Sequence, residues 1–125
     1  MRNRIVLCVL LCSFAGCAAK KEPLTAHGKP VAHWVDELKR PDPKARKKAV
    51  VALGQVGKAD PAAIPALAGA LADPDPRVRG EAVLALLKIG PDAREALPAL
   101  ENLRRDRDAT VRDHAAKAIA RIRGN

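Results

Sequence analysis

The chain repeats itself every 33 residues along most of its length. When the sequence is shifted against itself by this offset, similar residues coincide without any gap. The coinciding sets include Asp42, Asp75 and Asp108; Arg46, Arg79 and Arg112; Ala49, Ala82 and Ala115; and Leu53, Leu86 and Ile119. A repeat of this length indicates a solenoid, in which each unit buries its apolar face against the next unit.

Each period of the repeat predicts two short helices. In the middle copy, Asp75 suits an N-cap, Pro76 suits the first helical position and Gly90 suits a helix end. Between them apolar residues recur at spacings of three and four, which places them on one helix face. The first helices are predicted at 43-56, 76-89 and 109-122, and the second helices at 31-39, 61-72 and 93-105.

The repeated pattern has a counterpart in a known family. Asp-x-x-x-Arg-x-x-Ala-x-x-Ala-Leu-x-x-Ile-Gly, followed by Ala-Leu-Pro-x-Leu in the partner helix, resembles a HEAT repeat of the kind grouped with the phycobilisome-lyase HEAT-like repeats. The resemblance covers residues 31-125 and implies an all-α fold, a short α-solenoid of about three HEAT-like hairpins with end caps. We expect Trp34 to cover the N-terminal end of the apolar surface along which the helices pack. Lyase activity does not follow, because a fold does not carry a function.

Residues 1-16 are predicted to be a lipoprotein signal peptide. Two arginines precede an apolar run from Ile5 to Cys12, which is shorter than the roughly 20 residues of a membrane span. The sequence Phe14-Ala15-Gly16-Cys17 resembles the lipobox of bacterial lipoproteins and departs from it at Phe14, where Leu is usual. The resemblance implies that Cys17 is lipidated, which gives a stable membrane anchor. The alternatives are an ordinary signal peptide with a nearby cysteine and the start of a buried helix.

This interpretation divides the chain into three parts. After the signal, residues 17-30 form the lipidated cysteine and a flexible tether, since they are polar and interrupted by Pro and Gly. Residues 31-125 form the HEAT-like repeat domain. The expected location is the periplasmic or extracytoplasmic face of a bacterial membrane. All three cysteines lie within the first seventeen residues, so no disulfide joins parts of the repeat domain.

The positive charge of the chain raises nucleic acid as a partner. The formal net charge is +9, and the densest basic run is Lys44, Arg46, Lys47 and Lys48. However, Tyr is absent, and the two aromatic residues lie in the predicted signal and end cap, so no platform for stacking bases is predicted. A basic nucleic-acid-binding solenoid therefore stays a minor alternative.

An aspartate and an arginine stand four residues apart in every repeat. One hypothesis is a row of arginines that binds phosphates or carboxylates of a ligand. The favoured hypothesis is a structural ladder, in which each Asp caps its helix while the Arg pairs with it or with the Asp of a neighbouring repeat. The ladder residues are Asp42, Arg46, Asp75, Arg79, Asp108 and Arg112.

No catalytic residue, metal site or cofactor is predicted, and the chain is not expected to be an enzyme. His27, His33 and His114 are far apart in the repeat and no Cys or paired carboxylate joins them. The single Ser, Ser13, lies in the predicted signal, so no Ser-His-Asp arrangement is available.

The predicted function is a membrane-anchored protein-protein interaction or scaffold module, monomeric, with an unknown protein partner. The resemblance implies that the second helices line the partner face. Its outward positions are His33, Asp36, Ala66, Gly69, Ala99 and Asn102. The middle of this face is small and uncharged, which suits a bound peptide or helix. The alternatives are an accessory or regulatory subunit of a lyase-like enzyme and a spacer without a specific partner.

Overall fold

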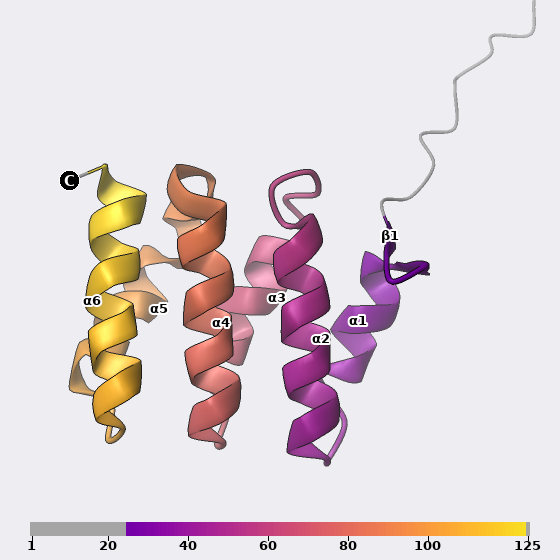
Figure 1. Ribbon diagram of the computed structural model, residues 1–125, viewed down its shortest axis with the longest axis horizontal. Helices are drawn as coiled ribbons and strands as arrows, with labels where there is room; N and C mark the ends of the chain where they lie inside the picture. Colours follow the sequence, from indigo (N-terminus) through magenta and orange to yellow (C-terminus); the bar gives the residue numbers. More distant parts are fainter. Residues whose placement is uncertain (1–24, 125) are drawn as a thin grey trace, which may run out of the picture.

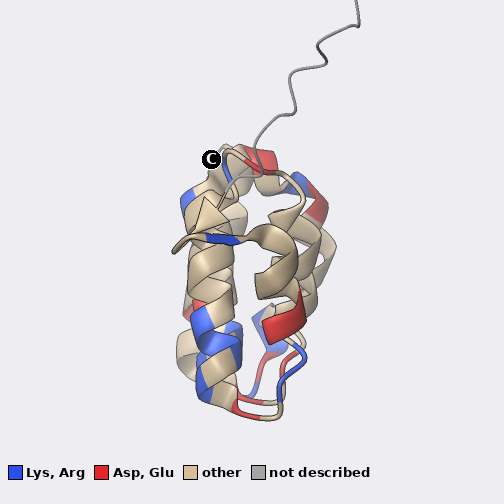
Figure 2. Cartoon of the chain, turned by 90° about the vertical axis from the view of Figure 1, so that its right-hand side faces the viewer, with Lys and Arg blue, Asp and Glu red and all other residues tan. Residues whose placement is uncertain are grey.

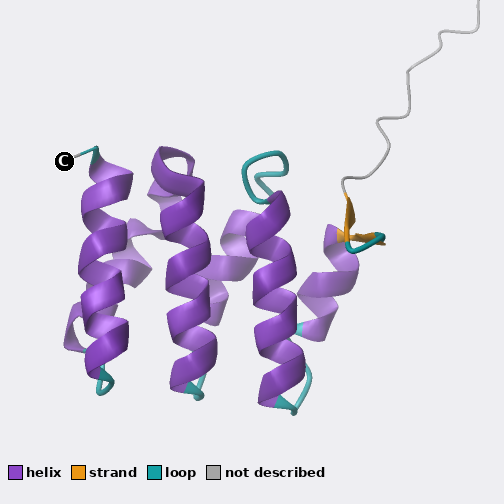
Figure 3. Cartoon of the chain, viewed as in Figure 1, coloured by secondary structure: helices purple, strands orange, loops and turns teal. Residues whose placement is uncertain are grey.

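The computed structural model describes residues 25–124, which form an array of paired helices (Figure 1). The predicted all-α solenoid is confirmed, with a short hairpin added at its N-terminal end (Figure 3). The elements are β1 (Thr25–Ala26), β2 (Lys29–Pro30), α1 (Val31–Glu37), α2 (Pro43–Val56), α3 (Ala63–Ala70), α4 (Pro76–Ile89), the 3-10 helix η1 (Gly90–Ala96), α5 (Leu97–Asn102), the 3-10 helix η2 (Leu103–Arg105) and α6 (Ala109–Arg123).

The helices form two layers. The longer helices α2, α4 and α6 lie side by side in one layer, and α1, α3 and α5 lie behind them in the second (Figure 1). Each long helix packs against the next long helix and against members of the second layer. This arrangement follows from the repeat, because an amphipathic helix of three or four turns needs neighbours to bury its apolar stripe.

The long helices begin where the aspartate caps predict. Asp42, Asp75 and Asp108 have extended backbones, and their carboxylates accept hydrogen bonds from the backbone N–H two residues later, at 3.0, 2.8 and 2.8 Å respectively. Each side chain thereby satisfies a donor that the helix leaves open. Gly90 ends α4 with φ of 76°, a conformation that favours glycine.

The second layer departs from the prediction in its details. α3 is shorter than the predicted 61-72, and the predicted helix at 93-105 is divided into η1, α5 and η2. The backbone of Ala93 leaves the helical region, with φ of −88° and ψ of 22°. Pro98, inside the predicted range, also lacks the N–H that a continuous α-helix would use. In place of one continuous second-layer helix, this segment is therefore the α-helix α5 between the 3-10 helices η1 and η2.

A single core of aliphatic side chains joins the layers. Leu53 and Leu86 are fully buried and Ile119 is 2% exposed, so the three equivalent positions line one seam. The described residues contain no buried polar or charged residue. Small residues let the long helices approach closely, since Gly54 of α2 faces Ala85 of α4.

The N-terminal end is closed by the hairpin and Trp34. The Trp34 side chain is 5% exposed, and its indole Nε1 donates to the backbone oxygen of Ala26 at 3.0 Å. β1 and β2 pair antiparallel beside it. Residues 25–30 were predicted to belong to the flexible tether, but they carry this hairpin, which Trp34 holds through its hydrogen bond to Ala26. The predicted signal peptide and Cys17 lie outside the described residues.

Candidate functional site

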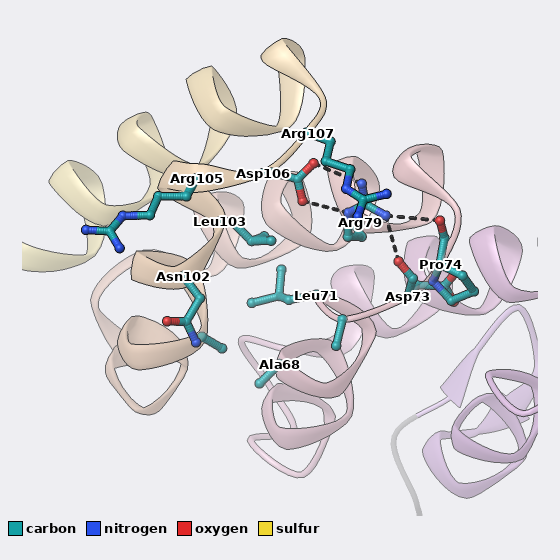
Figure 4. Close-up of a pocket in the computed structure, with 12 residues that line it drawn as sticks. Ala68, Leu71, Asp73, Pro74, Arg79, Asn102, Leu103, Arg105, Asp106 and Arg107 are labelled. Atoms are coloured by element: carbon teal, nitrogen blue, oxygen red, sulfur yellow. Dashed lines mark hydrogen bonds and ion pairs between the residues drawn. The ribbon is translucent and has the colours of Figure 1, made fainter.

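The arginines of the ladder connect successive loops. The Arg79 Nη1 donates to the backbone oxygens of Asp73 and Pro74, at 2.8 and 3.1 Å. Its Nε and Nη2 donate to the two carboxylate oxygens of Asp106, at 2.8 and 2.9 Å (Figure 4). One guanidinium therefore ties the loop before its own helix to the loop before the next long helix.

Arg46 makes the same contacts one repeat earlier. Its Nη1 donates to the backbone oxygens of Arg40 and Pro41, while Nε and Nη2 hold Asp73 at 2.7 and 3.0 Å. The arginines thus pair with the aspartate of the neighbouring loop, and not with the capping aspartate of their own helix. Sequence reasoning left Asp73 and Asp106 out of the ladder, although they too stand 33 residues apart.

The Arg79–Asp106 pair is largely shielded from water. The two side chains are 14% and 7% exposed. The hydrogen bonds from Arg79 lower the pKa of Asp106, and those bonds likewise raise the pKa of Arg79. Both groups stay charged and neutralise each other, so Arg46 and Arg79 serve the fold, and the ligand-binding hypothesis is not needed for them.

The predicted partner face is divided among three places. His33 lies at the N-terminal end, where its ring packs edge-on against Trp34, and Asp36 is exposed and pairs with Lys39 at 3.0 Å. Gly69 is exposed on α3, whereas Ala66 is partly buried and packs against the core. Of the six predicted residues, Ala99 and Asn102 line one cavity in the described part of the chain.

That cavity is a groove of about 640 Å³ between the C-terminal ends of α3 and α5 (Figure 4). Its apolar lining consists of small and aliphatic side chains, and its polar lining consists of three arginines, two aspartates and one asparagine. The lining residues are Ala68, Leu71, Ala72, Asp73, Pro74, Arg79, Ala99, Asn102, Leu103, Arg105, Asp106 and Arg107.

The charges of this groove are not balanced within the described residues. Asp73 and Asp106 are already held by the ladder arginines. Arg105 and Arg107 are exposed, and among residues 25–124 neither has a carboxylate within ion-pair distance. The groove therefore presents a net positive charge beside an apolar surface, which favours an acidic ligand.

The basic run on α2 is a separate feature. Lys44, Lys47 and Lys48 are exposed near the N-terminal end of this helix, where Figure 2 shows basic residues gathered. Lys47 lies 3.8 Å from Glu81, and Arg46 is taken into the ladder. The run therefore offers fewer available charges than its sequence indicates.

Residues 25–124 contain neither a metal-binding cluster nor a helix that could span a membrane. No group of three or more His, Cys, Asp or Glu side chains there is arranged to hold a metal ion. No helix in the same range is both long and apolar enough to cross a membrane. The Nδ1 atom of His114 is buried without a hydrogen-bond partner, and His114 lines a smaller groove beside Leu84.

Known proteins share the sequence pattern and the fold. The HEAT repeats profile matches residues 31–122. No curated protein matches the chain. The complex of CpcE and CpcF of phycocyanin lyase from Nostoc sp. PCC7120 is similar in structure, with 28% sequence identity and a TM-score of 0.66 over 83% of this chain and 40% of that chain.

Two further solved structures resemble this fold. Human deoxyhypusine hydroxylase has 29% identity and a TM-score of 0.63 over 76% of this chain and 32% of that chain. A designed armadillo repeat protein in complex with the peptide (KR)4 has 24% identity and a TM-score of 0.63, over 74% and 46% of the two chains. This chain spans less than half the length of each of these structures.

Proposed function

This chain belongs to the HEAT repeat family, and from that premise we propose that it binds a partner protein through the groove between α3 and α5. The observation that carries the proposal is the groove itself, which combines an apolar lining with two arginines that lack carboxylate partners in the described residues. Two similar structures are complexes, one of CpcE with CpcF and one of a designed protein with a peptide. They support a role in protein recognition.

The ligand that suits this groove is an acidic segment with small apolar side chains. Arg105 and Arg107 supply the charge, and the methyl groups of Ala68 and Ala99 leave room for a close approach. Arginine forms bidentate hydrogen bonds with carboxylates, which adds direction to the attraction. A basic peptide such as the (KR)4 ligand of the designed armadillo protein would be repelled here.

The proposed function includes attachment to a bacterial membrane through lipid at Cys17, on the exported side. The support is the order of residues 1-17, which runs from charged to apolar to small residues before the cysteine. An extended chain covers at most about 3.5 Å per residue, so the segment from Cys17 to Thr25 can span at most about 28 Å. The α1 end of the array would then lie nearest the membrane.

Site-specific crosslinking tests the groove. A photoreactive amino acid at Asn102 should capture a partner in native membranes, and the double variant Arg105→Glu, Arg107→Glu should lose this capture. The matched control is Arg94→Glu, which removes an exposed positive charge outside the groove. Equal capture by the unsubstituted protein, the double variant and the Arg94→Glu control would rule out the groove as the binding site.

A separate experiment tests the anchor. Mass spectrometry of the mature protein should find acyl chains on Cys17, and Cys17→Ser should release the protein from the membrane fraction. A mature protein that retains residues 1-16, or one whose cysteine carries no lipid, would contradict the anchor and leave the groove proposal intact.

An accessory subunit of an enzyme is a second candidate function. The likeness to the phycocyanin lyase complex, at 28% identity over 83% of this chain, favours it. In that case the captured partner would be an enzyme, and its activity would depend on the same groove arginines. Enzyme activity that is unchanged by the double variant would exclude this candidate.

A further inference from the structure

Arg112, the third arginine of the ladder, makes the same backbone contacts as Arg46 and Arg79, but no described carboxylate pairs with it. The Arg112 Nη1 donates to the backbone oxygens of Asp106 and Arg107, at 2.7 and 3.2 Å. These bonds match those of Arg46 and Arg79 to the loops before their own helices. Among residues 25–124, no acceptor meets the Nε and Nη2 of Arg112. Its guanidinium is therefore held in place through Nη1. The edge formed by Nε and Nη2, here called the open edge, has no acceptor within the described residues.

The rest of the ladder shows what the equivalent edge of Arg46 and Arg79 binds. Arg46 and Arg79 each hold an aspartate by both carboxylate oxygens. Each of these aspartates, Asp73 and Asp106, also accepts a hydrogen bond at 2.9 Å from the backbone N–H two residues later, just before a helix. The matching ligand is an aspartate in a turn that leads into a helix.

A second copy of this chain does not supply that aspartate. If a copy continued the array beyond α6 in the register of the repeat, the residue 33 positions before Asp73 would meet Arg112. That residue is Arg40, so two guanidinium groups would face each other. Charge repulsion thus opposes head-to-tail stacking, which is how solenoid units otherwise form open filaments.

The surface beside Arg112 permits a close approach. Val50 and Val83 are fully buried at equivalent positions in α2 and α4, whereas the corresponding Ala116 of α6 is exposed. Ala120 is equivalent to Gly54, which faces the next long helix, and it is also exposed. Within the described residues, α6 therefore presents small apolar side chains next to the open guanidinium.

We propose that this end surface, formed by Arg112, Ala116 and Ala120, docks the aspartate-bearing turn and following helix of a second, different protein. The partner completes the ladder as Asp106 completes it for Arg79. None of these three side chains lines the groove of the proposed function, so binding at either place can fail alone. A protein with both would hold two partners, or two parts of one partner, side by side.

A peptide of residues 91–123 is a direct probe, because it is one period of the repeat and carries Asp106 before a helix. The fluorescently labelled peptide is titrated with the full-length protein and its anisotropy is measured. The variants are Arg112→Gln in the protein and Asp106→Asn in the peptide. The matched control is Arg121→Gln, which removes the same charge from the same helix.

Each of the two test changes should weaken binding about tenfold, as expected for loss of a charge-assisted bidentate contact. Combined, they should cause no further loss, because both remove the same contact. Arg121→Gln and the groove variant Arg105→Glu, Arg107→Glu should retain binding. Circular dichroism checks that Arg112→Gln is folded, and Ala116→Glu provides a second way to block the surface.

Three results would overturn the proposal. The first is a peptide that does not bind, and the second is equal binding by the Arg112→Gln and Arg121→Gln proteins. The third is self-association of the full-length protein that Arg112→Gln abolishes in analytical ultracentrifugation, since the occupant would then be a second copy.

Discussion

Arg79 of α4 holds Asp106, in the loop before α6, by two hydrogen bonds, from Nε to Oδ2 at 2.8 Å and from Nη2 to Oδ1 at 2.9 Å. The same guanidinium also holds the loop before its own helix. Because successive units of a solenoid contact only their neighbours, such a link determines how well one unit is coupled to the next. The ladder is therefore part of the interface between repeats.

We expect Asp106→Asn to lower the free energy of unfolding by about 1–3 kcal/mol, because it leaves the Arg79 charge without its partner. Urea denaturation followed by circular dichroism measures the change. Asp113→Asn is the control, since Asp113 forms an exposed ion pair with Lys117 on the surface of α6 and should have little effect. Equal midpoints for the two variants would mean that the ladder does not couple the repeats.

Acid should lower the stability of the fold by protonating the carboxylates of Asp106 and Asp75. Hydrogen bonds from Arg79 lower the pKa of Asp106, and those from Arg77 lower the pKa of Asp75 to about 2. In the unfolded chain an aspartate takes up its proton near pH 3.9, so the stabilisation is complete above about pH 4 and is lost as the pH falls towards about 2. Urea midpoints measured across this range should fall, and they should fall less for Asp106→Asn.

A substitution at Leu86 tests the aliphatic core that joins the two helix layers. This side chain is fully buried at the centre of the middle repeat, so we expect Leu86→Ala to cost about 2–5 kcal/mol of stability. The half-buried Leu84 on the same helix is the control, and Leu84→Ala should cost less. A melting temperature that Leu86→Ala leaves unchanged would show that this position does not join the layers.

The sequence predicted the long helices well because their boundary signals are local. An aspartate cap is specified by a few adjacent residues, so the predicted starts at residues 43, 76 and 109 agree with the structure. The second-layer helices lack such signals, since α3 and α5 follow Ala62 and Ala96, which offer no side-chain cap. Their ends depend on packing and prolines, and they were predicted less accurately.

The candidate site was harder to predict because it depends on contacts between distant residues. The hairpin at the N-terminal end is held by Trp34, eight residues after Ala26. The groove combines the ends of α3 and α5 with the loops that carry Asp73 and Asp106. Sequence periodicity identified Ala99 and Asn102 as outward positions, but it did not show that they meet arginines there.

Two glycines should respond in opposite ways to the same substitution. In a helix interior, alanine is favoured over glycine by about 1 kcal/mol, because glycine loses more backbone freedom on folding. At Gly69 of α3, a Cβ atom would meet nothing within 4 Å, so Gly69→Ala should stabilise the protein by about 0.5–1 kcal/mol.

At Gly54 of α2, a Cβ atom would lie 2.8 Å from the Cβ of Ala85 and 3.4 Å from its Cα, so α2 and α4 would have to move apart. The cost of overpacking is about 1–3 kcal/mol and should exceed the gain in helix propensity, so Gly54→Ala should destabilise the protein. Thermal unfolding of both variants measures the signs. If Gly54→Ala also raised the melting temperature, the close approach of α2 and α4 would be absent from the protein in solution.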